Sequence, residues 1–219
     1  MTSSAITAPT SWVTSTLTRV AGSAVSWFLF TLSFSLLFQV TVVVMALGGS
    51  CASGGPYEIA VECPESVAAF APLSIFGGLI AVAVGAFFAR GFGTPLTAWA
   101  WPILFGGLGG AFLWVFIVSG EVTGLIIGVM FLIMGLVPLA LEVRASPQRI
   151  LIGPTAADGS RFFEGARARR SMTARGTPNP DDAVRATPLH WLAALVVSLG
   201  FGFLGYWVAG VWFAAAVAG

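Results

Sequence analysis

Five long and predominantly apolar stretches are the feature of this sequence that most limits its fold. They cover residues 24–47, 67–89, 96–119, 123–141 and 189–217. A helix needs about 20 apolar residues to cross the hydrocarbon core of a bilayer, and a helix satisfies its own backbone polar groups where no water is present. None of the stretches alternates polar and apolar residues as a barrel strand does. The sequence therefore predicts an all-α polytopic membrane helix bundle, with residues 1–219 forming a single membrane domain.

The composition supports a lipid environment. Only 9% of the residues are charged and 57% are hydrophobic, whereas soluble domains carry about 25% charged residues. A soluble chain with so few charges would expose large apolar patches to water, which monomeric proteins rarely do.

The arginines predict the orientation, because positive residues stay on the cytoplasmic side of a membrane. The chain has no lysine, and its ten arginines fall before the first stretch, between the second and third, or between the fourth and fifth. Arg19 is expected just before the first helix. The loops at 48–66 and 119–122 contain acidic residues and no arginine. We expect the N-terminus inside, the C-terminus outside, an outer loop at 48–66 and a cytoplasmic loop at 142–188. The richness in Ala, Gly and Val without lysine is typical of a bacterial chain, so we expect the bacterial cell (inner) membrane.

The outer loop holds both cysteines of the chain, Cys51 and Cys63. Outside the cytoplasm these two residues are expected to form a disulfide. If the second half of the loop is helical, Glu58, Glu62 and Glu65 share one face. Their carboxylates could then bind a divalent cation or an arginine-rich partner. The alternative is an acidic loop that is simply solvated.

The same loop carries a local resemblance. Between the cysteines the chain reads Gly54-Gly55-Pro56-Tyr57, and a proline follows Cys63. This arrangement resembles the loop after the first helix in small, functionally uncharacterised integral membrane proteins of actinobacteria. The resemblance covers about 25 residues of the chain and implies no activity.

The apolar stretches contain no ionisable residue at their centres, which argues against a proton-coupled transporter or an ion pump. Gln39 is the strongest candidate for a functional polar residue within these stretches. It could line a polar path or bond to a partner. Alternatively, it could bond within the bundle, with nearby hydroxyls bonding to carbonyls of the preceding turn.

Small residues four apart predict close helix packing within the chain, in preference to a dimer seam. These rows are Gly77, Ala81 and Gly85; Gly106 and Gly110; Gly124 and Gly128; and Ser198 and Gly202. Pro138 is expected to kink the fourth helix, because proline removes a backbone donor. Trp27 is expected at the cytoplasmic membrane interface.

The cytoplasmic segment is rich in Pro, Gly and Ser/Thr and is expected to be mostly irregular. Its basic cluster, Arg167, Arg169 and Arg170, could lie on an anionic leaflet. The alternative is that these arginines serve only to orient the chain.

The sequence contains no nucleophile–base pair, zinc-ligand spacing or phosphate-binding loop, and only one histidine. We therefore expect no catalytic residues, no metal site, no cofactor and no nucleic-acid partner. Our leading hypothesis is a non-enzymatic accessory or scaffold subunit that binds other integral membrane proteins or itself. The alternative is a small oligomeric channel or carrier for a neutral solute, with Gln39 in its lining. A weaker alternative is a membrane-embedded lipid-modifying enzyme that uses Glu58, Glu62 or Glu65 as acid or base.

Overall fold

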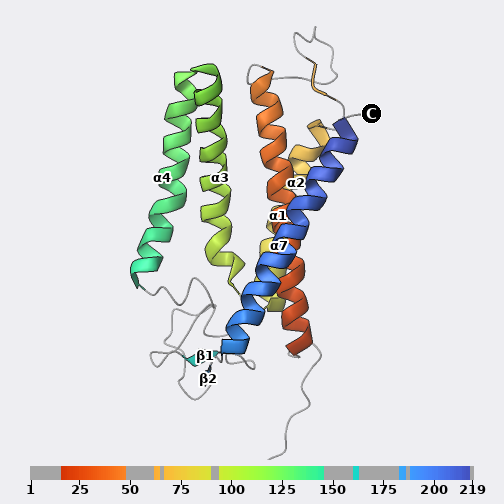
Figure 1. The fold of residues 1–219 in the computed structure, drawn as a ribbon, viewed down its shortest axis with the longest axis vertical. Helices are drawn as coiled ribbons and strands as arrows, with labels where there is room; N and C mark the ends of the chain where they lie inside the picture. Colours follow the sequence, from red (N-terminus) through yellow and green to blue (C-terminus); the bar gives the residue numbers. More distant parts are fainter. Residues whose placement is uncertain are drawn as a thin grey trace, which may run out of the picture.

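The computed structural model describes residues 16–47, 62–64, 67–89, 94–145, 160–162, 183–185 and 188–217. Within them lie five helices long and apolar enough to cross a membrane (Figure 1). The elements in chain order are α1 (Thr16–Ala46), α2 (Val67–Val84), the π-helical turn η2 (Gly85–Ala89), α3 (Leu96–Ser119), α4 (Val122–Ala145), β1 (Ser160–Phe162), β2 (Ala183–Arg185) and α7 (Pro188–Val217). The prediction of a helical chain with five helices long and apolar enough to cross a membrane is confirmed.

The first helix begins earlier than the sequence predicted. α1 starts at Thr16 instead of residue 24, so Arg19 lies in its first turn and the expectation that Arg19 precedes the helix is wrong. Hydropathy locates the point where a chain becomes apolar, whereas backbone hydrogen bonding continues through the polar residues before that point. At about 1.5 Å per residue, the 31 residues of α1 span about 46 Å, more than the roughly 30 Å hydrocarbon core. The helix therefore has length to tilt or to project beyond the core.

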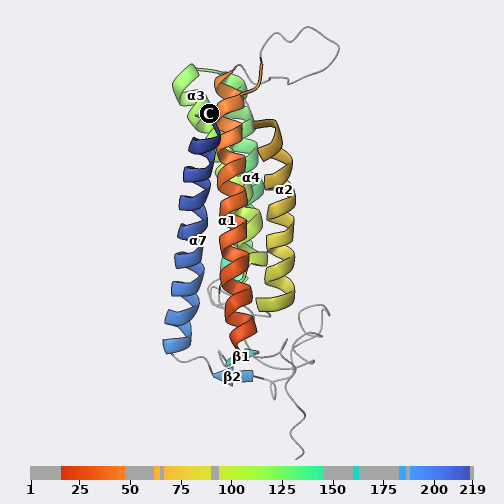
Figure 2. The same cartoon turned by 90° about the vertical axis from the view of Figure 1, so that its right-hand side faces the viewer.

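α1 lies between α2 and α7, and the three form one unit (Figure 2). α7 meets α1 through small residues three or four apart, namely Ala194, Ser198, Gly202, Gly205 and Ala209. A Cβ atom on Gly205 would collide with the Phe28 carbonyl oxygen and the Thr31 hydroxyl. The backbones of α1 and α7 thus approach closely, and Ser198 and Gly202 lie in an intramolecular seam as expected.

The predicted small-residue row on α2 also packs within the chain. Ala81 is completely buried. A Cβ atom added to Gly77 would collide with the Ser33 hydroxyl, and one added to Gly85 would lie 3.3 Å from the Ser26 hydroxyl. Small residues on α2 and at the start of η2 therefore face serines on α1 along this contact.

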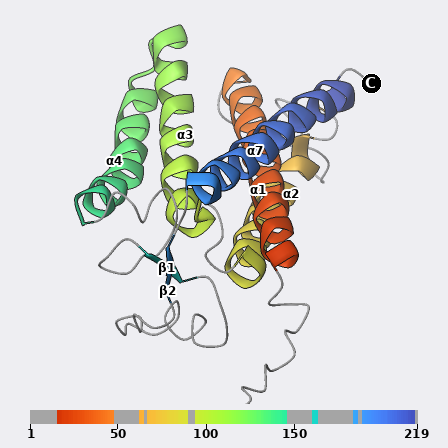
Figure 3. The same ribbon diagram turned by 60° about the horizontal axis from the view of Figure 1, so that its bottom comes forward.

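α3 and α4 form an antiparallel hairpin beside that unit (Figures 1 and 3). Gly120 adopts the left-handed conformation (φ 75°) that ends α3, and its N–H donates to the Phe116 carbonyl at 2.8 Å. That conformation favours glycine at a helix C-terminus. The hairpin connection is correspondingly short, with α4 beginning at Val122.

The hairpin seam differs in part from the prediction. Gly124 and Gly128 of α4 lie in it as expected, each within about 3 Å of an α3 atom if a Cβ were added. Gly106 is confirmed as a close-contact residue of α3, because a Cβ added to Gly135 of α4 would lie 2.9 Å from the Gly106 nitrogen. A Cβ atom added to Gly110 would meet no atom within 4 Å, so naming Gly110 as a close-contact residue was wrong. Gly109 is also a close-contact residue of α3, because an added Cβ would lie 2.9 Å from the Gly128 carbonyl oxygen. Spacing alone could not choose among the four neighbouring glycines of α3.

Two short strands lie in the segment expected to be mostly irregular. β1 and β2 pair antiparallel, with Arg161 opposite Val184. Strands of three residues give too little alternation for a sequence pattern to reveal them. They lie at the end of the bundle where α1 begins (Figure 3).

Candidate functional site

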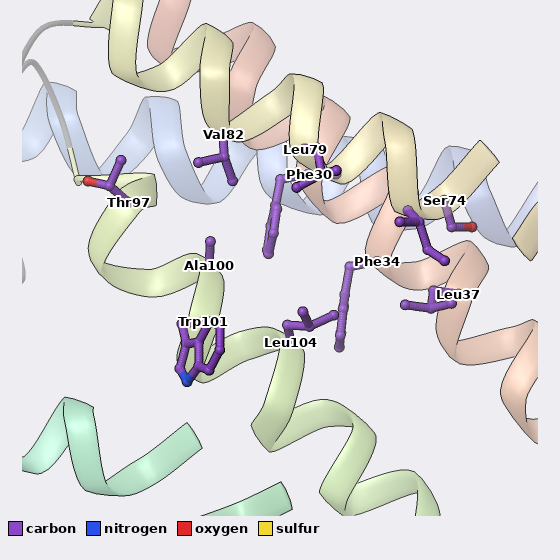
Figure 4. Close-up of a pocket in the computed structure, with 12 residues that line it drawn as sticks. Phe30, Phe34, Leu37, Ser74, Leu79, Val82, Thr97, Ala100, Trp101 and Leu104 are labelled. Atoms are coloured by element: carbon purple, nitrogen blue, oxygen red, sulfur yellow. The ribbon is translucent and has the colours of Figure 1, made fainter. Parts of the chain in front are cut away.

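An apolar groove lies where the α3–α4 hairpin meets the three-helix unit (Figure 4). Its volume is about 360 Å³. α1, α2 and α3 each supply lining residues. The apolar ones are Phe30, Phe34 and Leu37 from α1, Ile75, Leu79 and Val82 from α2, and Ala100, Trp101 and Leu104 from α3.

Aromatic rings and glycines shape this groove. Phe30 and Phe34 stack in parallel with ring centroids 6.2 Å apart, and both rings extend toward α3 (Figure 4). The Phe34 ring lies against Gly107, where an added Cβ would collide with it. On the opposite wall Gly78 has no side chain, and an added Cβ would meet nothing within 4 Å. The hollow thus persists because Gly78 leaves unfilled the space that a larger α2 side chain would occupy.

The groove has little polar character. Its two hydroxyl-bearing residues are Ser74 and Thr97. The Ser74 hydroxyl is buried and donates to the Phe70 carbonyl at 2.6 Å, so its proton is already engaged. Thr97 is exposed in the first turn of α3. The lining therefore presents a hydrocarbon surface along its length and a hydroxyl at one end.

Trp101 lines the groove and also makes a hydrogen bond to α4. Its indole N–H donates to the Met134 carbonyl at 3.0 Å. In a regular helix that carbonyl would accept from the residue four positions later, which is Pro138, and proline has no N–H. Pro138 lies inside α4, which continues to Ala145. Trp101 thus supplies from α3 the donor that Pro138 removes.

Trp27 also makes a hydrogen bond from its indole N–H to a backbone carbonyl of another segment. Its indole N–H donates to the Thr94 carbonyl at 2.9 Å, and the side chain is buried. This bond joins α1 to the segment that leads into α3. The Trp27 ring is packed inside the protein. The expectation that this ring lies among lipid at the membrane interface is therefore wrong.

Gln39 lies partly buried in α1, and its amide group donates to the Ser35 hydroxyl at 3.4 Å. Neighbouring hydroxyls bond within the same helix: Thr31 to the Trp27 carbonyl at 2.9 Å and Thr41 to the Leu37 carbonyl at 2.8 Å. These bonds follow the intrahelical alternative that the sequence left open. Gln39 is not among the residues that line the groove, and a role in transport stays a prediction.

The other predicted site residues lie mostly outside the described parts of the chain. These are Cys51, Glu58, Glu65, Arg167, Arg169 and Arg170. Glu62 is exposed and Cys63 is half-buried at the described edge of the outer loop. In the ranges that the structure describes, no three His, Cys, Asp or Glu residues are grouped so that they could hold a metal ion.

Sequence reasoning missed the groove and both indole hydrogen bonds. One signal was available, because Pro138 predicts that the Met134 carbonyl needs a donor from outside its helix. The identity of that donor depends on the tertiary register of α3 against α4, which spacing does not reveal.

Comparisons of the chain with protein-family models, with curated proteins and with solved structures gave no match. The resemblance of the outer loop to actinobacterial membrane proteins therefore stays an expectation.

Proposed function

We propose that this chain is a non-enzymatic accessory or scaffold subunit of a bacterial membrane protein assembly, and that α4 is its docking helix. The supporting observation is that α4, among the described elements, packs almost entirely against α3. The described residues leave most of the rest of its circumference exposed.

The uncovered face of α4 has the form of a helix-docking surface. Apolar residues recur on it at intervals of three or four, namely Ile126, Met130, Ile133, Val137 and Leu141, and all five are largely exposed. Residues at this spacing share one side of a helix. Side chains of two helices interdigitate along such a surface, and van der Waals packing is the main attraction between helices in lipid.

The hairpin is suited to this role. α1 is enclosed by α2, α7 and α3, so a partner cannot reach most of its surface. α4 is the outer element beyond α3 (Figure 1). A partner helix could therefore pack on α4 without displacing any contact within the chain.

Orientation and location belong to the same proposal. Arg19 in the first turn of α1 and Arg144 in the last turn of α4 lie at the same end of the bundle. The positive-inside rule supports placing that end in the cytoplasm of a bacterium. The Cys51–Cys63 loop then faces an oxidising compartment, where the predicted disulfide can persist.

Native mass spectrometry after mild detergent extraction tests the proposal. The wild-type chain is expected to copurify with another integral membrane protein in a fixed ratio. Ile133→Trp should weaken that complex, because the larger ring disrupts interdigitation at the centre of the α4 face. Leu199→Trp is the matched control, since Leu199 is an exposed apolar residue on α7.

Two outcomes would contradict the proposal. One is a symmetric homo-oligomer without any other protein, which would favour the channel or carrier for a neutral solute. The other is a partner complex that survives Ile133→Trp and is lost with Leu199→Trp, which would place the docking surface on α7.

A further inference from the structure

We propose that the groove between α1, α2 and α3 binds one acyl chain of an anionic membrane phospholipid. The groove is lined by α1, α2 and α3 and not by the docking face of α4, so the acyl-chain site does not depend on the proposed function. Only the headgroup contact involves α4, through Arg144 at the end of that helix. The proposal rests on the chemistry, the size and the position of the groove.

The groove is continuous with the surface that faces the hydrocarbon. Leu79 and Trp101 line it and are also 63% and 50% exposed on the outside of the bundle. An occupant can therefore enter sideways from the bilayer. The Ser74 hydroxyl already donates to the Phe70 carbonyl, so the walls offer mainly hydrocarbon contact. Such walls favour an occupant without polar groups along its length, because a polar group there would lose its hydrogen bonds to water.

The size of the groove suits a slender occupant. Its volume of about 360 Å³ lies near the lower end of the roughly 300–1,000 Å³ typical of ligand pockets. One acyl chain is an occupant of that kind.

The position of the groove matches one leaflet. Thr97 marks one end of the α3 wall, in the first turn of the helix, and Leu104 marks the other. Arg144 is exposed in the last turn of α4, at the end of the hairpin where α3 begins. The close approach of Gly135 on α4 to the Gly106 backbone on α3 gives the register of the two helices.

Axial positions follow from that register. Arg144 is nine residues beyond Gly135, and Thr97 is nine residues before Gly106, so Arg144 lies near the level of Thr97. Leu104 is seven residues beyond Thr97, or about 10 Å farther along the axis, which lies within the roughly 15 Å of hydrocarbon in one leaflet. A phosphate at the level of Arg144 therefore has an acyl chain that enters the groove at the Thr97 end and runs toward Leu104, and the cation favours an anionic headgroup.

Gly78 provides the test. A Cβ atom added to Gly78 would meet no protein atom within 4 Å, and Gly78 lines the groove. A leucine side chain at this position would take up part of the groove, so Gly78→Leu should compete with the acyl chain. Gly200 of α7 is equally open and does not line the groove, so Gly200→Leu is the matched control. Gly78→Ala, which adds one methyl group, gives a graded variant that would remain usable if Gly78→Leu did not fold.

The measurement is native mass spectrometry of delipidated full-length protein titrated with phosphatidylglycerol or with phosphatidylcholine, both carrying the same acyl chains. Wild type and Gly200→Leu should retain one phosphatidylglycerol, at least threefold more often than phosphatidylcholine. Gly78→Leu should lose retention of both lipids, and Gly78→Ala should fall between. Arg144→Gln should remove the preference between the two lipids and keep the retained chain.

Equal retention by wild type and both Gly78 variants would overturn the assignment of the groove. Equal retention of the two lipids by wild type would overturn the anionic headgroup. Loss of the lipid in Gly200→Leu as well would show general unfolding or annular binding, and would also contradict the proposal.

Discussion

The hydrogen bond between Trp101 and the Met134 carbonyl leads to a quantitative prediction. Trp101→Phe keeps an aromatic ring and removes the N–H. The Met134 carbonyl then has no donor, because Pro138 cannot supply one within the helix. Interhelical hydrogen bonds in membrane proteins contribute about 0.6 kcal/mol on average and about 1.7 kcal/mol at most.

We expect a value in the upper half of that range. The average is small because polar groups find other partners when helices separate in the membrane. The Met134 carbonyl cannot do so by helix formation, because Pro138 blocks that alternative even in an isolated α4. The expected contribution of the bond is about 1–1.5 kcal/mol, which is roughly a five- to twelvefold change in the unfolding equilibrium.

A double-mutant cycle isolates this contribution from the change in ring size. In the Pro138→Ala background the residue at 138 regains its N–H and can donate to Met134. Trp101→Phe should therefore cost about 1 kcal/mol less free energy of unfolding there than in the wild type. The assay is reversible unfolding in mixed micelles by added SDS, followed by circular dichroism.

Trp114 supplies the control for this cycle. It is another exposed tryptophan of α3, and its indole has no such bond to α4. Trp114→Phe and Pro138→Ala should be additive within about 0.3 kcal/mol. If Trp101→Phe and Pro138→Ala are additive to the same degree, the carbonyl does not depend on Trp101 and the reasoning is refuted.

Three further predictions concern packing, oxidation and topology. Gly205→Leu should lower the free energy of unfolding by more than about 2 kcal/mol, because the α1 backbone leaves no room for a side chain; Gly200→Leu should change it by less than about 0.5 kcal/mol, and similar losses in the same SDS titration would contradict the α1–α7 seam. Cys51 and Cys63 should react with a maleimide only after reduction, and full labelling of the denatured, unreduced protein would rule out the disulfide. Ser119→Cys, in a chain with both native cysteines replaced by serine, should react with a membrane-impermeant maleimide added to intact cells. Labelling only after lysis would show that the orientation is opposite to the predicted one.

The existence and number of the helices could be read from the sequence, because length and apolar character are local properties. Residues 96–119 were predicted with the same bounds that α3 has. The start of α1 could not be found this way, since Thr16 to Ser23 form helix without being strongly apolar. Local signals locate the lipid-spanning part of a helix better than they locate its ends.

The arrangement of the helices was much less predictable. Gly77 and Gly85 were recognised as packing positions because they stand in one clear row. The α3 glycines form overlapping rows, and only the placement of α4 shows that Gly106 and Gly109 lie against it and that Gly110 does not. The groove was not predictable for the same reason: its lining comes from three helices, and the shape of a space between helices depends on their angles and register.

The enclosed position of α1 has a consequence for biogenesis. Its neighbour α7 is synthesised about 140 residues after α1 ends; at roughly 5–20 residues per second, this interval lasts on the order of 7 to 28 s. During that time the surface of α1 around Thr31 must face lipid or the insertion machinery without its eventual neighbour. The Thr31 hydroxyl already bonds to the Trp27 carbonyl within α1, so this group needs no outside partner while the ribosome completes the chain. Assembly can thus wait for the last helix without leaving that hydroxyl exposed to hydrocarbon in an unsatisfied form.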